Sequence, residues 1–202
     1  TARENKMKKH EHSGNPRKTL ENPKEVLIKA GLEKGDFTLL DIGTGSGYLS
    51  LTAAEIMGNT STVYAIDSHE ETIKILDSYL SQKEIKNIFA IKADTVNENP
   101  IKRDSVDICL MSNVVHGFAA NNEIEKVLQN LSSILKDDGK LIVIDFNKKD
   151  TSFGPPSEIR VDPDQLEDIL EPYGYSLVNS FEIGVNQYCA TFKKICLQSK
   201  WC

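Results

Sequence analysis

The 202-residue sequence has no apolar run long enough to form a membrane-spanning helix. Its longest apolar runs, residues 108–111 and 141–144, have only the length of a β-strand. The polar N-terminal residues contain no apolar core of the kind found in a signal peptide. We therefore expect a cytoplasmic protein that does not bind a membrane.

Cysteine is scarce as well. The four cysteines lie far apart and form no C-x-x-C pair: Cys109, Cys189, Cys196 and Cys202. This spacing argues against a zinc knuckle and against a disulfide framework. Cys109 lies inside an apolar run, which predicts a small core residue. The pair His10 and His12 has no third ligand at a suitable spacing, so the sequence predicts no metal site.

The chain also lacks the overall positive charge of a general nucleic-acid binder, since its net charge is −6 and its pI is near 5.3. Basic side chains are concentrated in residues 1–18, which carry a local charge of +4. This basic arm is predicted to be either a solvated tail or a flap that folds over a bound ligand. Residues 19–195 form the predicted domain, and residues 196–202 form a short tail.

Strand-length apolar runs alternate with amphipathic helical patterns along the domain. Strands are expected at residues 37–40, 61–67, 87–94, 106–111 and 140–146, followed by a hairpin of residues 175–183 and 186–194. Near-continuous apolar strands separated by helices indicate a parallel sheet that is covered on both faces. The sequence thus predicts an α/β fold: a Rossmann-like, doubly wound, mostly parallel seven-stranded sheet with a C-terminal antiparallel hairpin.

Three helix starts carry capping signals. Asn22 precedes Pro23, Asn122 precedes a helix with Glu125 at the capping-box position, and Asp162 precedes Pro163 with Gln165 at the box position. Between the fifth strand and the last helix, residues 148–160 form a polar loop that is either a connector or part of an acceptor pocket.

A glycine-rich turn joins the first strand to the following helix. Gly43, Gly45 and Gly47 occupy alternate positions, and they remove the Cβ atoms that would keep a ligand away from the backbone. The peptide N–H groups beyond them point outward at a helix start, where the dipole favours anionic or electron-rich groups. This pattern predicts a nucleotide-binding turn.

Polar residues stand at or just after the ends of several predicted strands: Asp41, Asp67, Asp94 and Asn113. In a doubly wound sheet, ligands bind at the carboxyl ends of the strands, near the switch in strand order. Asp67 closes the second strand 20 residues after Gly47, where a carboxylate can accept hydrogen bonds from both ribose hydroxyls. Asp94, one strand further out, is placed to accept from an adenine amino group.

The turn departs from the dinucleotide pattern G-x-G-x-x-G, because Tyr48 follows Gly47 directly. Residues 40–47 instead resemble motif I of class I S-adenosylmethionine-dependent methyltransferases. Residues 65–68, 92–94 and 107–116 resemble their second, third and fourth motifs, and residues 135–141 are similar to the segment before strand five. The resemblance covers residues 20–195. It is strongest to the small single-domain methyltransferases that include the quinone-biosynthesis C-methyltransferases.

The resemblance implies S-adenosylmethionine as cofactor, with S-adenosylhomocysteine as product. It places Gly43, Gly45 and Gly47 near the methionine part of the cofactor. Asp41, Thr44, Tyr48 and Ser68 are further candidate cofactor-binding residues. The same resemblance implies that Asp67 lies at the ribose, that Asp94 and Thr95 lie near the adenine, and that Asn113 lines the methyl-donor cleft.

A sulfonium methyl group is already activated, so the protein has mainly to hold the acceptor against it. A base is needed only where the acceptor must lose a proton, and His116 is the candidate. The alternative role for His116 is a structural hydrogen bond. His69 is predicted to be a residue at a helix start rather than a catalyst.

No N-P-P-Y or D-P-P-Y motif follows the fourth strand, and no inserted domain offers a surface for a macromolecule. The sequence therefore predicts a small-molecule acceptor. Paired cysteines like those of metalloid methylators are not evident, although Cys189 on the hairpin leaves that class open. Further alternatives are an NAD(P)-dependent oxidoreductase, a catalytically silent cofactor-binding module and a methyltransferase that acts on a protein partner. The oligomeric state is not predicted.

Overall fold

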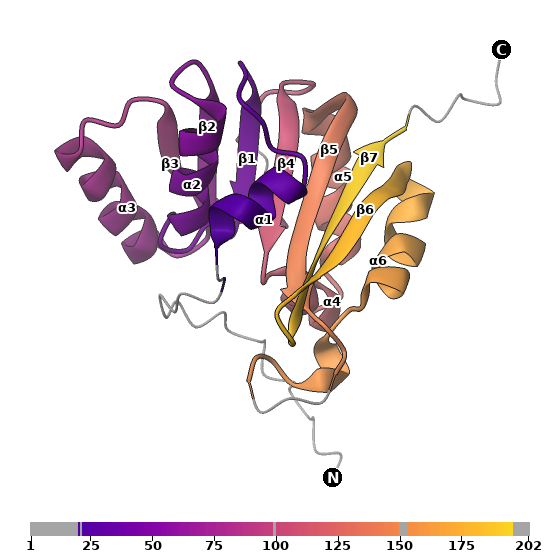
Figure 1. The fold of residues 1–202 in the computed structure, drawn as a ribbon. Coiled ribbons are helices and arrows are strands. Elements are labelled where there is room, and N and C mark those ends of the chain that lie inside the picture. The colour runs from indigo at the N-terminus through magenta and orange to yellow at the C-terminus, as the bar shows by residue number, and fades with distance from the viewer. Residues whose placement is uncertain (1–19, 21, 99, 150–152, 196–202) are drawn as a thin grey trace, which may run out of the picture.

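The computed structural model describes residues 20, 22–98, 100–149 and 153–195. The basic arm with His10 and His12, and the tail of residues 196–202, lie outside these described residues. Seven strands form one sheet in the order β3-β2-β1-β4-β5-β7-β6 (Figure 1). The strands are β1 (Thr38–Ile42), β2 (Thr62–Asp67), β3 (Ile88–Lys92), β4 (Val106–Ser112), β5 (Leu135–Phe146), β6 (Tyr175–Ile183) and β7 (Gln187–Lys194).

Strands β1 to β5 pair in parallel, whereas β7 runs antiparallel to both β5 and β6. The predicted fold class, including the C-terminal antiparallel pair, is confirmed. The strand order reverses on either side of β1, because β2 and β3 extend in one direction and β4 and β5 in the other. The carboxyl ends of β1 and β4 thus form the switch point at which such sheets bind ligands.

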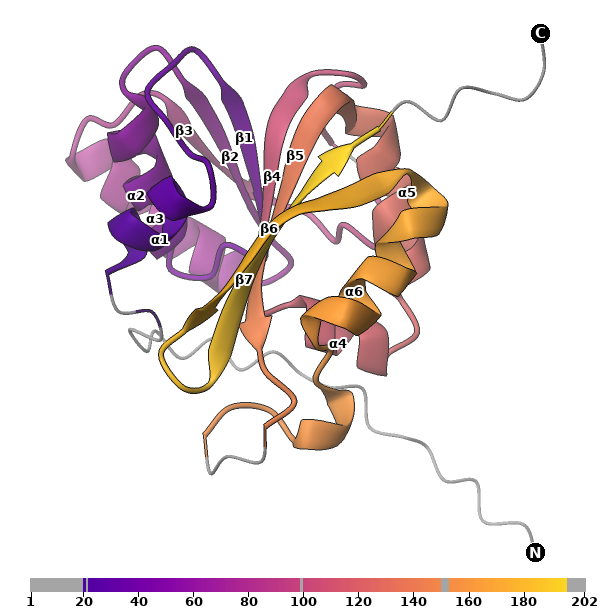
Figure 2. The same cartoon turned by 45° about the vertical axis from the view of Figure 1, so that its right-hand side comes forward.

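Helices cover both faces of the sheet (Figure 2). One face carries α1 (Pro23–Lys29), α2 (Tyr48–Met57) and α3 (Glu70–Gln82). The other carries α4 (Val115–Ala120), α5 (Ile124–Ile134) and α6 (Pro163–Leu170), with the short 3-10 turns η1 (Ser157–Ile159) and η2 (Glu171–Tyr173) on either side of α6. No helix in the described part of the chain is long and apolar enough to cross a membrane.

Alternation along the central strands supplies a core on each face. Leu39 belongs to the core formed with residues of α1, α2 and α3, and its neighbour Leu40 belongs to the core formed with residues of α4, α5 and α6. Full burial of a leucine stabilises the fold by about 1.5–3 kcal/mol relative to exposure. Cys109 and Cys189 are free thiols with no exposed surface, and Tyr175 and Tyr188 are also buried. Cys109 is therefore the core residue that its apolar surroundings predicted.

The capping predictions have different outcomes. Asp162 accepts from the Gln165 N–H and Gln165 contacts the Asp162 N–H, so the predicted capping box is present. The prediction for Asn122 is wrong: its φ is 56°, and α5 starts after Glu123 with no side-chain cap. Asn22 does precede α1, but its left-handed backbone leaves the helix without a side-chain cap bond. A left-handed residue does not have the extended backbone from which a cap side chain reaches the next turn.

The fifth strand begins earlier than predicted. β5 starts at Leu135 instead of Lys140, because Leu135 pairs with Val106 before the register shifts between Val106 and Ile108. Gly139 lies in this irregular stretch, and a Cβ there would come within 2.6 Å of the Leu135 side chain. The charged residues before Gly139 interrupt the apolar pattern, so the sequence does not predict that the strand begins at Leu135.

Candidate functional site

The glycine turn lies between the end of β1 and the start of α2, at the switch point of the sheet. Gly43, Gly45 and Gly47 have φ values of 74°, 53° and 77°, all in the left-handed region that L side chains disfavour. A Cβ on Gly43 would collide with Val114, and one on Gly47 would collide with Leu76. A Cβ on Gly45 would meet no protein atom within 4 Å, so this glycine borders open space. The turn thus leaves space for a ligand to lie directly against its backbone.

The Asp41 carboxylate is hydrogen-bonded to the glycine turn and to the first turn of α2. Its side chain is almost fully buried, and its Oδ2 accepts hydrogen bonds from Thr44 Oγ1 at 2.8 Å and Ser50 Oγ at 2.7 Å. Burial raises the pKa of Asp41 to about 6, although the two hydroxyl bonds lower it and nearby Asp67 raises it further. Sequence reasoning missed Ser50, whose only signal is a polar residue within the apolar start of α2.

Asp67 closes β2 and faces the same turn. Its Oδ2 accepts the Gly45 N–H at 2.9 Å, and its Oδ1 accepts the His69 N–H at 2.9 Å. The imidazole Nδ1 of His69 lies 3.1 Å from the same Oδ1, and Ser68 Oγ lies 3.5 Å from that nitrogen. His69 occupies the N-cap position of α3, as the sequence predicted. The ends of β1 and β2 are therefore joined through one carboxylate that reaches the glycine turn.

Asp94 follows β3, the next strand outward. Its Oδ1 accepts the Val96 N–H at 3.1 Å and its Oδ2 accepts from Asn97 Nδ2 at 2.8 Å, so the carboxylate organises a local turn. The Thr95 carbonyl accepts from Asn130 Nδ2 of α5 at 2.9 Å. Asp67 and Asp94 thus stand at the carboxyl ends of two adjacent parallel strands, which is the arrangement that the sequence predicted for a nucleoside.

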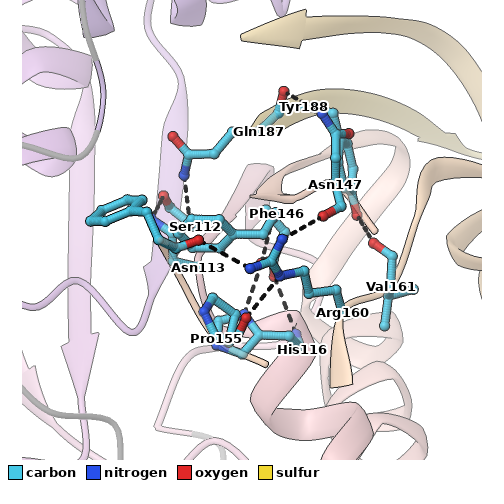
Figure 3. A network of polar contacts seen from close by, with 12 residues as sticks. Ser112, Asn113, His116, Phe146, Asn147, Pro155, Arg160, Val161, Gln187 and Tyr188 are labelled. Carbon is cyan, nitrogen blue, oxygen red and sulfur yellow. Dashed lines mark hydrogen bonds and ion pairs between the residues drawn. The ribbon is translucent and has the colours of Figure 1, made fainter. Parts of the chain in front are cut away.

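Asn113 follows β4 directly and has a φ of 57°. Its Oδ1 accepts from Gln187 Nε2 at 2.8 Å, and Asn147 Nδ2 donates to the Gln187 carbonyl at 3.2 Å (Figure 3). These contacts join the ends of β4, β5 and β7 across the site. Sequence reasoning found Asn113 but missed Gln187 and Asn147, because their proximity depends on the antiparallel pairing of β5 with β7.

His116 lies in the first turn of α4 and is 5% exposed. Its Nδ1 lies 2.8 Å from Oδ1 of Asp145, and its backbone N–H donates to Oδ2 of Asp145 at 3.1 Å. The Asp145 side chain is fully buried near the end of β5. Sequence reasoning missed Asp145, although a lone acid inside the apolar run of residues 141–146 was an available signal.

The loop after β5 is organised around Arg160, which is 3% exposed. Its guanidinium donates to the carbonyls of Asn147, Lys149, Phe153 and Pro155 at 2.6–3.1 Å (Figure 3). The Phe146 ring packs near the rings of Phe153 and His116. This loop is therefore more than a connector, because its backbone wraps around one buried cation beside His116.

A groove of about 230 Å³ lies between α4, η1 and the start of α6. Apolar and polar side chains both line it, including Ala119, Ala120, Lys148, Ile159, Gln165 and Ile169. From the loop after β5, the groove is lined by Lys148, Glu158, Ile159 and Arg160, which therefore border a space that an elongated ligand could enter.

These features define a nucleotide-binding Rossmann-like domain, and comparison with known proteins is more specific. The family profile of a methyltransferase domain matches residues 33–195. Over 126 residues the chain is 25% identical to the ubiquinone/menaquinone biosynthesis C-methyltransferase UbiE of Wigglesworthia glossinidia brevipalpis, a match that covers 62% of this chain and 49% of that protein. It is 31% identical over 127 residues to a 2-phytyl-1,4-naphtoquinone methyltransferase of a Nostoc species, covering 62% of this chain and 53% of the relative.

A solved structure of an S-adenosylmethionine-dependent methyltransferase from Aquifex aeolicus superposes with a TM-score of 0.79 at 28% identity, covering 87% of this chain and 91% of the other. The chain belongs to the class I S-adenosylmethionine-dependent methyltransferase family. It spans about half the length of the curated relatives that it matches. Its cofactor is accordingly S-adenosylmethionine, and the oxidoreductase alternative is set aside.

Proposed function

We propose that this protein transfers a methyl group from S-adenosylmethionine to a small-molecule acceptor. The observation that carries the proposal is the left-handed glycine turn at the switch point, whose Gly45 faces open space and is joined to Asp67 at the end of β2. Such a turn fits a ligand that must lie against the backbone and a ribose that needs an acidic partner.

In this proposal the residues predicted from the sequence bind different parts of the cofactor. The turn from Gly43 to Tyr48, supported by Asp41, holds the methionine part. Asp67 accepts from the ribose hydroxyls, with Ser68 beside it, while Asp94 and Thr95 border the adenine. Asp67 and Asp94 already accept hydrogen bonds from protein donors. On cofactor binding, each carboxylate would accept additional hydrogen bonds from the cofactor or accept these in place of the present ones.

When bound, the cofactor supplies an activated methyl group on a sulfonium. The chain then has to hold the acceptor in line with that group and to exclude water. Asn113 and Gln187 form the polar edge on which we expect an acceptor to be oriented, and their mutual hydrogen bond fixes the asparagine amide.

Several named relatives support a small acceptor, since they are methyltransferases of quinones. Another relative is an arsenite methyltransferase. Arsenite chemistry gains no support from the described thiols, because Cys109 and Cys189 are both fully buried. We also propose a cytoplasmic location, as expected from the sequence.

The test is incubation of the protein with methyl-labelled S-adenosylmethionine and a cell extract separated into small-molecule and macromolecular fractions. Our proposal predicts label in the small-molecule fraction that depends on the protein. Label found in macromolecules alone would contradict the small-acceptor proposal. The Asp67→Ala variant is the control, because we expect it to bind the cofactor more weakly and therefore to label either fraction less at low cofactor concentration.

A further inference from the structure

The two edges of the sheet differ in their regularity. β6 forms one edge, and a register shift between Leu177 and Asn179 interrupts its pairing with β7. An irregularity of this kind twists an edge strand and makes it a poor template for a further strand. β3 forms the other edge, and its five residues pair with β2 in a continuous register (Figure 1). The β3 edge is therefore the one that can accept another strand.

Alternate residues of β3 turn their peptide groups toward β2. Val63 N–H donates to the Asn87 carbonyl at 2.8 Å, and Ala93 N–H donates to the Asp67 carbonyl at 3.1 Å. In a regular ladder, residues that bond to one neighbouring strand alternate with residues that face away from it. Because positions 87 and 93 face β2, the odd-numbered residues between them face it as well. The residues whose peptide groups face outward are Ile88, Ala90 and Lys92.

One face of this edge is apolar and only partly covered. The Phe89 side chain is 48% exposed, and its ring lies 5.8 Å from the ring of Tyr64 on β2. Ile91 projects from the same face and is partly buried. A helix follows each of β1, β2 and β4, whereas the described residues between β3 and β4, 93–98 and 100–105, form none. Apolar side chains and outward peptide groups thus occur together, which is the combination that pairs strands of different chains.

One register pairs the whole of β3 with β3 of a second copy. In an antiparallel pair, residues whose peptide groups face outward must lie opposite one another. Pairing centred on Ala90 meets this condition, because Ile88 then lies opposite Lys92 and Ala90 lies opposite its own equivalent. Phe89 lies opposite Ile91 in the non-hydrogen-bonded pairs, where side chains approach most closely.

The charges beside β3 are complementary in the same register. Lys86 precedes the strand and is exposed, and Asp94 follows it. Lys86 would lie opposite Asp94 of the second copy, and twofold symmetry repeats this pair at the other end. Lys92 lies at the end of the pairing, where its aliphatic stem can cover Ile88 while its ammonium group reaches water. The edge therefore complements itself in hydrogen bonding, apolar contact and charge.

We propose that two copies of this chain form a dimer through β3, with the strands antiparallel about a twofold axis at Ala90. The two seven-stranded sheets then become one continuous sheet. This inference does not depend on the proposed function. It has a consequence for the cofactor site, because Lys86 of the second copy would lie beside Asp94, the carboxylate at the proposed adenine position.

The first test measures mass and register together. Sedimentation velocity should give about 45 kDa, twice the 22.5 kDa of one chain, at concentrations up to about 100 μM. Residue-resolved hydrogen exchange should show that the N–H groups of Ile88, Ala90 and Lys92 exchange about 10-fold or more slowly in the dimer than in dilute monomer. A monomer at every concentration, or a dimer in which these N–H groups exchange freely, would overturn the inference. A monomer with these N–H groups protected would also overturn it, because another segment of the same chain would then cover the edge.

Ala90→Pro separates the dimer contact from the fold. The Ala90 N–H faces outward, so proline removes a donor to the second copy without removing a bond to β2, and proline is tolerated at such edge positions. Each dimer loses two hydrogen bonds, which should raise the dissociation constant by about 10-fold or more. If Ala90→Pro fails to fold, Phe89→Lys decides, because it places a charge in the apolar contact with Ile91. A dimer that survives Phe89→Lys unchanged would contradict pairing through β3.

Lys86→Glu tests the charge pair. It would set two carboxylates opposite each other, so the dimer should weaken by about 10-fold at low ionic strength and by less in high salt. Val178→Lys is the matched control, because Val178 is an exposed apolar residue on the opposite edge strand and its replacement should leave the dimer intact. Dissociation caused by Val178→Lys but not by Phe89→Lys would refute the inference. Failure of the wild type to bind S-adenosylhomocysteine would contradict the proposed function alone.

Discussion

Replacing the buried carboxylate at the base of the glycine turn should change how the stability of the protein depends on pH. Asp41→Asn keeps an oxygen that can accept from Thr44 and Ser50 while removing the negative charge. Burial raises the pKa of Asp41 from 3.8 to about 6. A shift of this size corresponds to about 3 kcal/mol, because each pH unit is worth about 1.4 kcal/mol.

The sign follows from proton binding. Between pH 3.8 and about 6 the folded protein holds the Asp41 proton more tightly than the unfolded chain does, so the free energy of unfolding falls as pH rises through that window. Above it, the cost of the buried charge stays constant. Asparagine does not ionise, so it has no cost that changes with pH. The stability of Asp41→Asn minus that of the wild type should therefore increase by about 2 kcal/mol between about pH 4.5 and about pH 7.5 and then level off.

Urea unfolding of both proteins across this pH range, without cofactor, measures the difference directly, because the other titrating groups cancel. A difference that does not change with pH would refute the reasoning about Asp41. The same variant should bind S-adenosylmethionine more weakly, since the cofactor carries positive charge and the variant removes a carboxylate beside its turn. A residue that lowers stability and improves binding is typical of functional sites.

Three further substitutions are expected to have distinct effects. Gly45→Ala should lower the free energy of unfolding by only about 1 kcal/mol, the cost of a left-handed alanine, because its Cβ meets no protein atom. Calorimetry should show that the same variant loses more than this in the free energy of S-adenosylhomocysteine binding. Gly43→Ala should destabilise the fold more than Gly45→Ala does in thermal unfolding, since its Cβ collides with Val114; equal stability would contradict the packing. Arg160→Lys should lower the free energy of unfolding by about 2 kcal/mol in urea, because the lysine ammonium cannot donate to the same set of carbonyls as the guanidinium. Unchanged stability would show that the loop does not depend on this cation.

The architecture was largely predictable because each strand and helix carries its own periodic signal. Leu39 and Leu40 point to opposite cores, and such near-continuous apolar strands identify a parallel sheet covered on both faces. The exceptions are local. Asn122 has a capping sequence but a left-handed backbone, and β5 extends back through charged residues because Leu135 finds a partner in Val106.

The candidate site was predictable only where its residues are close in sequence or end a parallel strand. The glycine turn and Asp67 satisfy that condition, and they lie together at the switch point. Gln187 and Arg160 do not, since their places depend on the register of β7 and on a loop without periodicity. Asp145 is an intermediate case: its burial could be inferred from the apolar run around it, but its pairing with His116 could not.

The central claim is that the turn and Asp67 bind S-adenosylmethionine, and isothermal titration calorimetry tests it most directly. S-adenosylhomocysteine should bind the wild type and Asp107→Ala equally well, because Asp107 accepts from Thr38 N–H and Lys136 near the start of β4. Asp67→Ala should lose about 1–3 kcal/mol of binding free energy, the cost of leaving polar partners unsatisfied. NAD should bind weakly or not at all. Equal affinity of Asp67→Ala and wild type for S-adenosylhomocysteine, or tight binding of NAD alone, would contradict the account.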